Sequence, residues 1–279
     1  MYLKRKDDLT YKNYIDELHI VIKNGGSITD THSHIHFTDY IGILDTTLER
    51  ARNNGVKKII TVGINYDDSL KAQQLASQYT DVYFAAGIHP SEVESFYEKE
   101  LFEVLCGDKK CVAIGEVGLD FYRNSTNRTL QEQVFKEFLN MSVYLNKPII
   151  IHSRNATAEI VPLLDNFTKH NTLKGVFHCF SGDEELLEWG IKHDFYFSFS
   201  GNITYANADK LRAQLRLIPR NRIFLETDCP YLTPMPFRGK KNEPAYIVYT
   251  LFTAYKITQM SLQDFAILLE QNVKNFFHV

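Results

Sequence analysis

The chain has 279 residues, and its 31 lysine and arginine residues against 34 aspartate and glutamate residues give a formal net charge of −3. Its 44% hydrophobic and 23% charged residues are ordinary for a globular protein, which excludes a disordered chain, a collagen-like chain and a small disulfide scaffold. A protein that coats nucleic acid has a strongly basic surface, so this chain must meet any phosphate with a local group of charges.

The cysteines and the N-terminal residues indicate the compartment. Cys106, Cys111, Cys179 and Cys229 form no CxxC pair, so a reducing compartment is the simpler expectation. The N-terminus lacks the apolar region of a signal peptide, and no stretch of the sequence approaches the roughly 18 apolar residues of a membrane helix. We therefore expect a cytoplasmic protein without a membrane anchor, and no obligate protein partner is evident.

Residues 1–27 are expected to form an N-terminal helical extension. Tyr14, Leu18 and Val21 recur at helical spacing, and the turn-forming residues 24–27, Asn-Gly-Gly-Ser, end the pattern. We expect this helix to dock on the main domain, which is predicted to span residues 28–279.

Short apolar runs alternate with longer amphipathic patterns along the rest of the chain. The expected strands cover residues 28–31, 58–62, 82–86, 111–115, 148–152, 175–178, 196–198 and 223–226. Amphipathic helical patterns lie around Leu48, Leu75 and Leu139. The alternation predicts parallel βαβ units, and eight such strands predict an α/β protein with a single (β/α)8 TIM barrel.

Potential metal ligands follow five of the expected strands, and the C-terminal ends of barrel strands meet on one face. They are His32, His34, Glu116, His152, His178 and Asp228. Residues two apart on a strand point to the same side, so His32 and His34 can grip one ion together. A bridging Glu116 would hold two ions about 3.5–4 Å apart, which suits in-line displacement at phosphorus. A lone histidine at a strand end is more often structural, but six such residues together predict a metal site.

At this point the motifs carry a family resemblance. DTHSH (30–34), GEVGLD (115–120), IHSR (151–154), FHCFSG (177–182), ETDCPYLTP (226–234) and RGKKNEP (238–244) resemble, in this order, the TatD family of metal-dependent deoxyribonucleases, which are amidohydrolase-like TIM-barrel hydrolases. The resemblance covers the chain from about residue 28 onward. It implies that His32, His34 and Asp228 hold one ion, that His152 and His178 hold a second, and that Glu116 bridges both. Glu116 stands where many amidohydrolase relatives have a carbamylated lysine, which favours this branch over lactonase-like or dihydroorotase-like relatives.

The resemblance and the charges together suggest a reaction. Two divalent ions (Mg, Mn or Zn) carry +4, and the Glu116 and Asp228 carboxylates supply −2, so the site keeps about +2 for a phosphodiester. We hypothesise that a metal-activated water attacks DNA and that Asp228 orients this water or accepts its proton. The family implies a 3′–5′ exonuclease. The alternative is a metal-dependent ester or amide hydrolase, such as a deacylase of charged tRNA. A non-enzymatic binding module is disfavoured because all six ligands are present.

Three further residues are candidate substrate contacts, each with a structural alternative. His89 donates to a phosphate or fixes the turn before Pro90. Arg154 makes a bidentate phosphate contact or a salt bridge. Ser181 places its hydroxyl on a phosphate or caps the helix expected after it.

Other residues near the expected strand ends have two readings as well. The basic run 238–244 is a solvated loop or a contact for the nucleic-acid strand. Phe121, Tyr122 and Tyr205 stack on bases or pack inside the protein. Cys179 and Cys229 adjoin ligands but face away from them on a strand, so we expect both to be buried small hydrophobic residues.

Overall fold

The structure is a computed structural model that describes residues 7–94, 98–122 and 127–279. The chain divides into two compact units, which are Met1–Ile59 with Phe199–Asn275 and Ile60–Ser198 with Phe276–Val279. The expected division into an extension over residues 1–27 and a domain over residues 28–279 stays a prediction.

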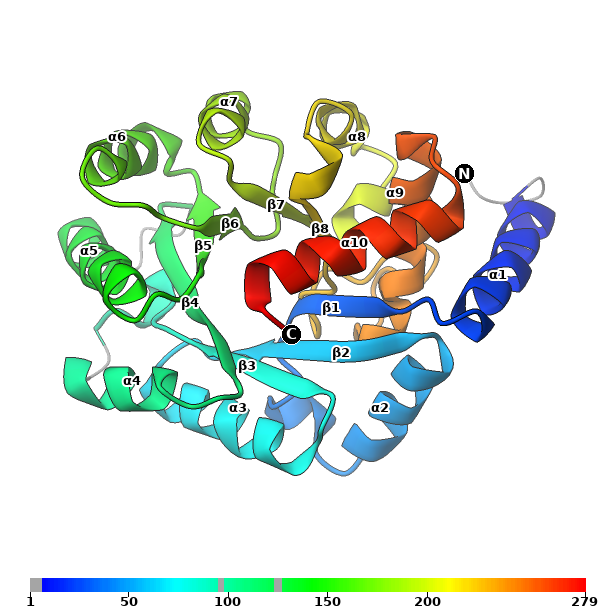
Figure 1. Ribbon diagram of the computed structural model, residues 1–279, viewed down its shortest axis with the longest axis horizontal. Coiled ribbons are helices and arrows are strands. Elements are labelled where there is room, and N and C mark those ends of the chain that lie inside the picture. The colour runs from blue at the N-terminus through cyan, green and yellow to red at the C-terminus, as the bar shows by residue number, and fades with distance from the viewer. Residues whose placement is uncertain (1–6, 95–97, 123–126) are drawn as a thin grey trace. The chain divides into compact units, whose positions relative to one another are not determined.

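Eight strands form one sheet in the order β1 to β8, and Figure 1 shows them alternating with helices along the chain. The strands are β1 (Ile28–Ser33), β2 (Val56–Val62), β3 (Val82–Ala86), β4 (Cys111–Asp120), β5 (Ile149–Arg154), β6 (Gly175–Phe177), β7 (Tyr196–Phe199) and β8 (Ile223–Leu225). The α-helices are α1 (Asp7–Lys23), α2 (Leu44–Asn53), α3 (Tyr66–Gln78), α4 (Lys99–Cys106), α5 (Arg128–Tyr144), α6 (Thr157–Thr168), α7 (Glu184–Lys192), α8 (Asp209–Leu215), α9 (Ile247–Thr258) and α10 (Leu262–Phe277). This is the predicted TIM barrel, in which each strand is followed by a helix.

The eight predicted strands are all present, but one of them has the wrong end. The predicted strand 111–115 continues through Glu116 to Asp120, because the glycines at 115 and 118 lie inside β4 and do not end it. The other ends agree with the prediction or shift by one or two residues. His152 therefore lies inside β5, whereas His178 directly follows β6 and Asp228 is the third residue after β8.

In the first unit, the first and last strands of the sheet lie side by side. The Thr31 hydroxyl on β1 donates a hydrogen bond to the carbonyl of Leu225 on β8 (3.0 Å). This contact between strands 194 residues apart gives the eight-stranded order the closure of a barrel. It also brings the segments that follow β1 and β8 together.

The N-terminal helix docks on this unit, as predicted. α1 ends at Lys23, and the amide of Gly26 closes the turn on the carbonyl of Val21 (2.9 Å). Tyr14 is buried, its hydroxyl donates to the carbonyl of Val248 on α9 (2.9 Å), and its ring contacts the ring of Phe252. In Figure 1 the two helices are labelled α1, in dark blue, and α9, in orange.

We expect the Tyr14→Phe substitution to lower the free energy of unfolding by about 1 kcal/mol, because it removes one buried hydrogen bond and keeps the ring. Chemical denaturation followed by circular dichroism measures this change. Tyr144→Phe is the matched control, since the Tyr144 side chain is 74% exposed. Equal stability of the two variants would contradict the docking role of the Tyr14 hydroxyl.

The second unit has an aromatic core around β3 to β7. Phe102 on α4 packs edge-to-face on Phe138 of α5, with ring centroids 5.0 Å apart, and Phe177 contacts Phe197 across the β6–β7 pair. β4 and β5 pair in parallel, with Gly118 aligned to His152 and Asp120 to Arg154. The core therefore fixes the strands that carry the candidate ligands of this unit. Among the residues that the structure describes, no helix is long and apolar enough to cross a membrane.

Candidate metal centre

In the first unit, three predicted ligands converge. His32 on β1 and His34 directly after it are buried, and their Nε2 atoms lie 3.8 and 3.5 Å from Oδ1 of Asp228. A tetrahedral ion with bonds of about 2.1 Å keeps its ligand atoms about 3.4 Å apart. The two imidazoles and the carboxylate thus have the spacing and the chemistry of a site for a divalent ion.

Two backbone hydrogen bonds hold Asp228 beside the histidines. The amide of Asp228 donates to the carbonyl of His32 (2.9 Å), and the amide of His34 donates to the carbonyl of Cys229 (2.8 Å). Asp228 has a φ of 54°, a left-handed conformation that aspartate tolerates better than most residues. The chain turns there after β8, and these backbone hydrogen bonds fix the position of Asp228 without the use of its carboxylate.

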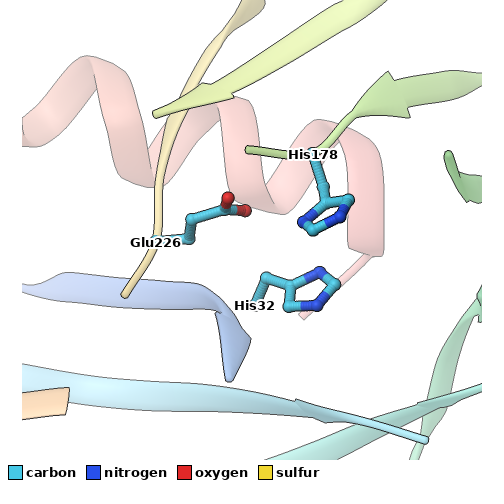
Figure 2. Close-up of side chains that lie close together, drawn as sticks. All are labelled: His32, His178 and Glu226. Atoms are coloured by element: carbon cyan, nitrogen blue, oxygen red, sulfur yellow. The ribbon is translucent and has the colours of Figure 1, made fainter. Parts of the chain in front are cut away.

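Two buried acids behind these ligands were missed by the sequence analysis. Asp30 accepts hydrogen bonds from the amide (2.9 Å) and the hydroxyl of Thr227, and so holds the residue before Asp228. Glu226 accepts a hydrogen bond from the Ser200 hydroxyl (2.7 Å). Figure 2 shows the Glu226 and His32 side chains of this unit, together with His178 of the second unit. The alternation of Asp30, His32 and His34 was the available signal, but the partners of the two acids lie 197 and 26 residues away.

Burial raises the pKa of Asp30 to about 8, from an ordinary 3.8. The folded protein therefore retains a proton that the unfolded chain releases above about pH 4. Between about pH 4 and pH 8, unfolding releases this proton, so the free energy of unfolding falls as the pH rises. We expect the free energy of unfolding of the metal-free protein to fall between about pH 4 and pH 8, by up to about 1.4 kcal/mol per pH unit.

The Asp30→Asn substitution is expected to remove this pH dependence, because an amide stays neutral throughout. Urea denaturation at several pH values, with a chelator present, measures the slope. Asp39→Asn changes an exposed residue of the same unit and should keep the slope of the natural protein. If Asp30→Asn also keeps that slope, the assignment to Asp30 is wrong.

In the second unit, the other three predicted ligands meet at one oxygen atom. Oε1 of Glu116 lies 2.7 Å from Nδ1 of His152 and 2.7 Å from Nε2 of His178, and the two ring nitrogens are 3.2 Å apart. These separations are shorter than the spacing around a tetrahedral ion, so a small opening of the group would admit one. One carboxylate and two imidazoles are a donor set that zinc and manganese accept.

The surroundings of Glu116 keep its carboxylate ionised. Burial by itself raises the pKa of this group, but interactions with His178 and His89 and hydrogen bonds from His152 and His178 outweigh burial and hold the pKa well below its ordinary value. An ionised carboxylate is the form that binds a metal ion. Glu116 is therefore ready to act as a ligand at neutral pH.

A further carboxylate of β4, Asp120, also reaches His152 and was missed by the sequence analysis. Its Oδ2 lies 3.2 Å from Nε2 of His152, on the side of the ring away from Glu116. The predicted strand stopped at Gly115, so the period-two spacing of Glu116 and Asp120 within a continuous strand was not used. The motif GEVGLD contained this signal.

His89 fixes the turn before Pro90, which was its structural alternative, and it also faces the ligand group of the second unit. Its Nδ1 accepts a hydrogen bond from the amide of Ser91 (3.1 Å) in the short helix Pro90–Glu92, and its Nε2 lies 3.6 Å from Oε1 of Glu116. Burial lowers the pKa of His89 to about 4, so the ring is neutral at pH 7. Because Nδ1 accepts, the proton lies on Nε2, which makes His89 a donor toward the site.

The other two predicted substrate contacts are exposed. The Arg154 guanidinium at the end of β5 stacks on the Tyr122 ring, 3.7 Å from its centroid. Ser181 does not cap the next helix: the side chain of Asp183 accepts the hydrogen bond from the amide of Leu186 and is the cap of α7. The capping alternative for Ser181 was wrong because three candidate caps stand in a row and only Asp183 has the required spacing to Leu186.

The aromatic and cysteine residues near the strand ends are partly packed inside the protein and partly exposed. Phe121 is buried and packs under Arg128, whereas Tyr122 is 58% exposed. Tyr205 donates its hydroxyl to the carbonyl of Thr233, and its ring lies under Arg238 of the exposed basic loop 238–241. Cys229 is buried as predicted. Cys179 is only half-buried, with a φ of 46°, because the chain turns after β6.

Comparison with known proteins gives a consistent set of relatives. The family model described as TatD related DNase matches residues 29–278. The uncharacterized metal-dependent hydrolase YabD of Bacillus subtilis is 35% identical over 252 residues, which are 90% of this chain and 98% of that protein. The 3′-5′ ssDNA/RNA exonuclease TatD of Cronobacter sakazakii is 34% identical over 215 residues, 74% of this chain and 81% of that protein. The crystal structure of the TatD homologue YJJV of Escherichia coli superposes with a TM-score of 0.85 at 27% identity, covering 90% of this chain and 98% of that one.

Proposed function

Because the chain belongs to the TatD related DNase family and is a metal-dependent hydrolase, we propose that it hydrolyses phosphodiester bonds of DNA from the 3′ end. The observation that carries the proposal is the meeting of two imidazole nitrogens on one carboxylate oxygen of Glu116, each at 2.7 Å. The Cronobacter sakazakii relative is named a 3′-5′ ssDNA/RNA exonuclease, which supports the polarity and favours single strands.

In this proposal each of the two groups of ligands takes part in holding a divalent ion, as the strand ends of TIM-barrel hydrolases do. His32, His34 and Asp228 would hold one divalent ion and His152 and His178 the other, with Glu116 as the residue that the family resemblance assigns to both. Divalent ions bound at these residues would supply Lewis-acid polarisation of the phosphate and would lower the pKa of a water molecule. Magnesium, manganese and zinc all suit ligands of this kind.

The protein's own side chains orient the reactants. Asp228 lies against His32 and His34 and is held by backbone hydrogen bonds, so its carboxylate is available to orient the attacking water and accept its proton. His89 donates a hydrogen bond from its Nε2–H to a phosphate oxygen. Arg154 offers a planar guanidinium for a second phosphate, and the Ser181 hydroxyl is a third donor.

The experiment is a digestion of 5′-labelled and 3′-labelled DNA, single-stranded and double-stranded, with magnesium, manganese or zinc titrated in. We expect immediate loss of a 3′ label and a ladder of shortening products from a 5′ label. Charged tRNA in the same buffers is the matched substrate for the ester-hydrolase alternative. Release of the amino acid without cleavage of any DNA would replace the nuclease by a deacylase.

A further inference from the structure

The imidazole of His152 lies between two carboxylates of the same strand. Nδ1 is 2.7 Å from Oε1 of Glu116, and Nε2 is 3.2 Å from Oδ2 of Asp120. Gly118, midway between the two acids, is aligned with His152 in the β4–β5 pair. A Cβ atom at Gly118 would lie 2.0 Å from the carbonyl oxygen of His152, so only glycine lets β4 approach this closely.

Asp120 is itself held in a fixed position. Its Oδ1 accepts a hydrogen bond from the amide of Tyr122 (2.9 Å). The buried side chain of Gln131 on α5 accepts from the amide of Asp120 (2.9 Å) and donates to its carbonyl (3.2 Å). The peptide of Asp120 is thereby clamped on both sides, and its second carboxylate oxygen is left to face His152.

We propose that Asp120 is the positioning residue of the metal site on His152: it accepts the Nε2–H of the ring and thereby presents Nδ1 to the ion. A histidine ligand that donates its other N–H to a carboxylate has a fixed tautomer and ring orientation and a more basic ligand nitrogen. This inference rests on the metal site of the proposed function, but not on the substrate.

A competing role for Asp120 would be that of a ligand. His89, Asp120 and His152 offer ligand atoms within 4.8 Å of one another, which could hold an ion on the Nε2 side of His152. The hydrogen bond from the amide of Ser91 occupies Nδ1 of His89 and leaves the proton on Nε2, the atom that would have to bind this ion. The geometry therefore favours a hydrogen-bonded carboxylate over an additional ion.

The test is a calorimetric titration of zinc or manganese into metal-free protein, with no nucleic acid present. We expect Asp120→Asn and Asp120→Ala to weaken the binding of one ion about 10- to 100-fold and to leave the number of bound ions unchanged. Asp108→Asn is the matched control, because Asp108 belongs to the same unit and bonds only outside the site, to Gln73 and Lys110. Unchanged affinity in both Asp120 variants overturns the proposal, as does the loss of a whole ion with the other affinities intact.

Nitrogen-15 NMR of the zinc-loaded protein gives a second readout, with His152→Gln to identify the signal. For His152 we expect one protonated Nε2 and one metal-bound Nδ1. In the Asp120 variants we expect the tautomer to change, or the His152 signals to broaden because two tautomers exchange. An identical His152 signal in the variants contradicts the positioning role. If Asp120→Ala does not fold, Asp120→Asn decides, since it keeps the size and the acceptor for Tyr122. Normal metal results without DNA cleavage would defeat only the proposed nuclease.

Discussion

The Glu116→Gln substitution is expected to abolish tight binding of the divalent ions and to lower the rate of hydrolysis about a thousandfold, which corresponds to about 4 kcal/mol of transition-state stabilisation. An amide keeps the size of the side chain but loses the negative charge. That charge is what His152 and His178 approach at 2.7 Å, and the environment holds the pKa of Glu116 well below its ordinary value. The loss should therefore appear in metal content first and in catalysis as a consequence.

Metal content after dialysis and the rate of release of a 3′ label measure the two effects separately. Glu132→Gln is the matched control, because Glu132 lies on α5 of the same unit in an exposed ion pair with Lys136. Such surface pairs contribute about 0–1 kcal/mol, so this variant should bind metal and act like the natural protein. A Glu116→Gln protein that retains both ions would show that the carboxylate is not a ligand.

The second large effect is expected for Asp228→Asn, which should lower kcat about 100- to 1,000-fold while the fold is retained. The backbone of Asp228 is held by the carbonyl of His32 and by the amide of Tyr231, and neither contact involves the carboxylate. The substitution therefore removes a negative oxygen beside His32 and His34 without moving the chain. A carboxamide can orient a water molecule but cannot accept its proton.

Thermal unfolding in the presence of a chelator checks that the Asp228→Asn protein keeps its stability, and steady-state digestion gives kcat and KM. We expect the effect in kcat, with KM changed little. Asp209→Asn, at a side chain that is 92% exposed in the same unit, is the control. Natural rates in Asp228→Asn would remove this residue from both the metal site and the proton transfer.

The fold could be predicted because its signals are local. Each strand is a short apolar run, each helix has its own amphipathic pattern, and the alternation of the two fixes the class. The six proposed ligands were found for the same reason: each lies at or near the end of a predicted strand, where a barrel gathers functional groups, although β4 runs four residues beyond Glu116. The positions of His32, His34 and Asp228 thus follow from strand assignment alone.

The residues that hold the ligands could not be predicted in this way. Asp30 and Thr227 are 197 residues apart, and nothing in either local sequence announces their hydrogen bond. Asp120 was lost because glycines were taken as the end of a strand, whereas the β4–β5 register shifts between Ile114 and Val117 and the strand goes on. The position of the Asp183 cap, two residues from the predicted one, depended on the exact start of α7.

The close approach of β4 at Gly118 has a consequence for how this chain can vary. Glu116 and Asp120 are the first and last residues of a five-residue segment with Gly118 at its centre. Because side chains alternate along a strand, these three positions face the same side. The insertion or deletion of one residue within this segment would turn one of the two acids to the opposite face of the sheet, as a slip of register does. The residues around this segment can therefore be substituted one at a time, but the number of residues between the two acids must stay the same.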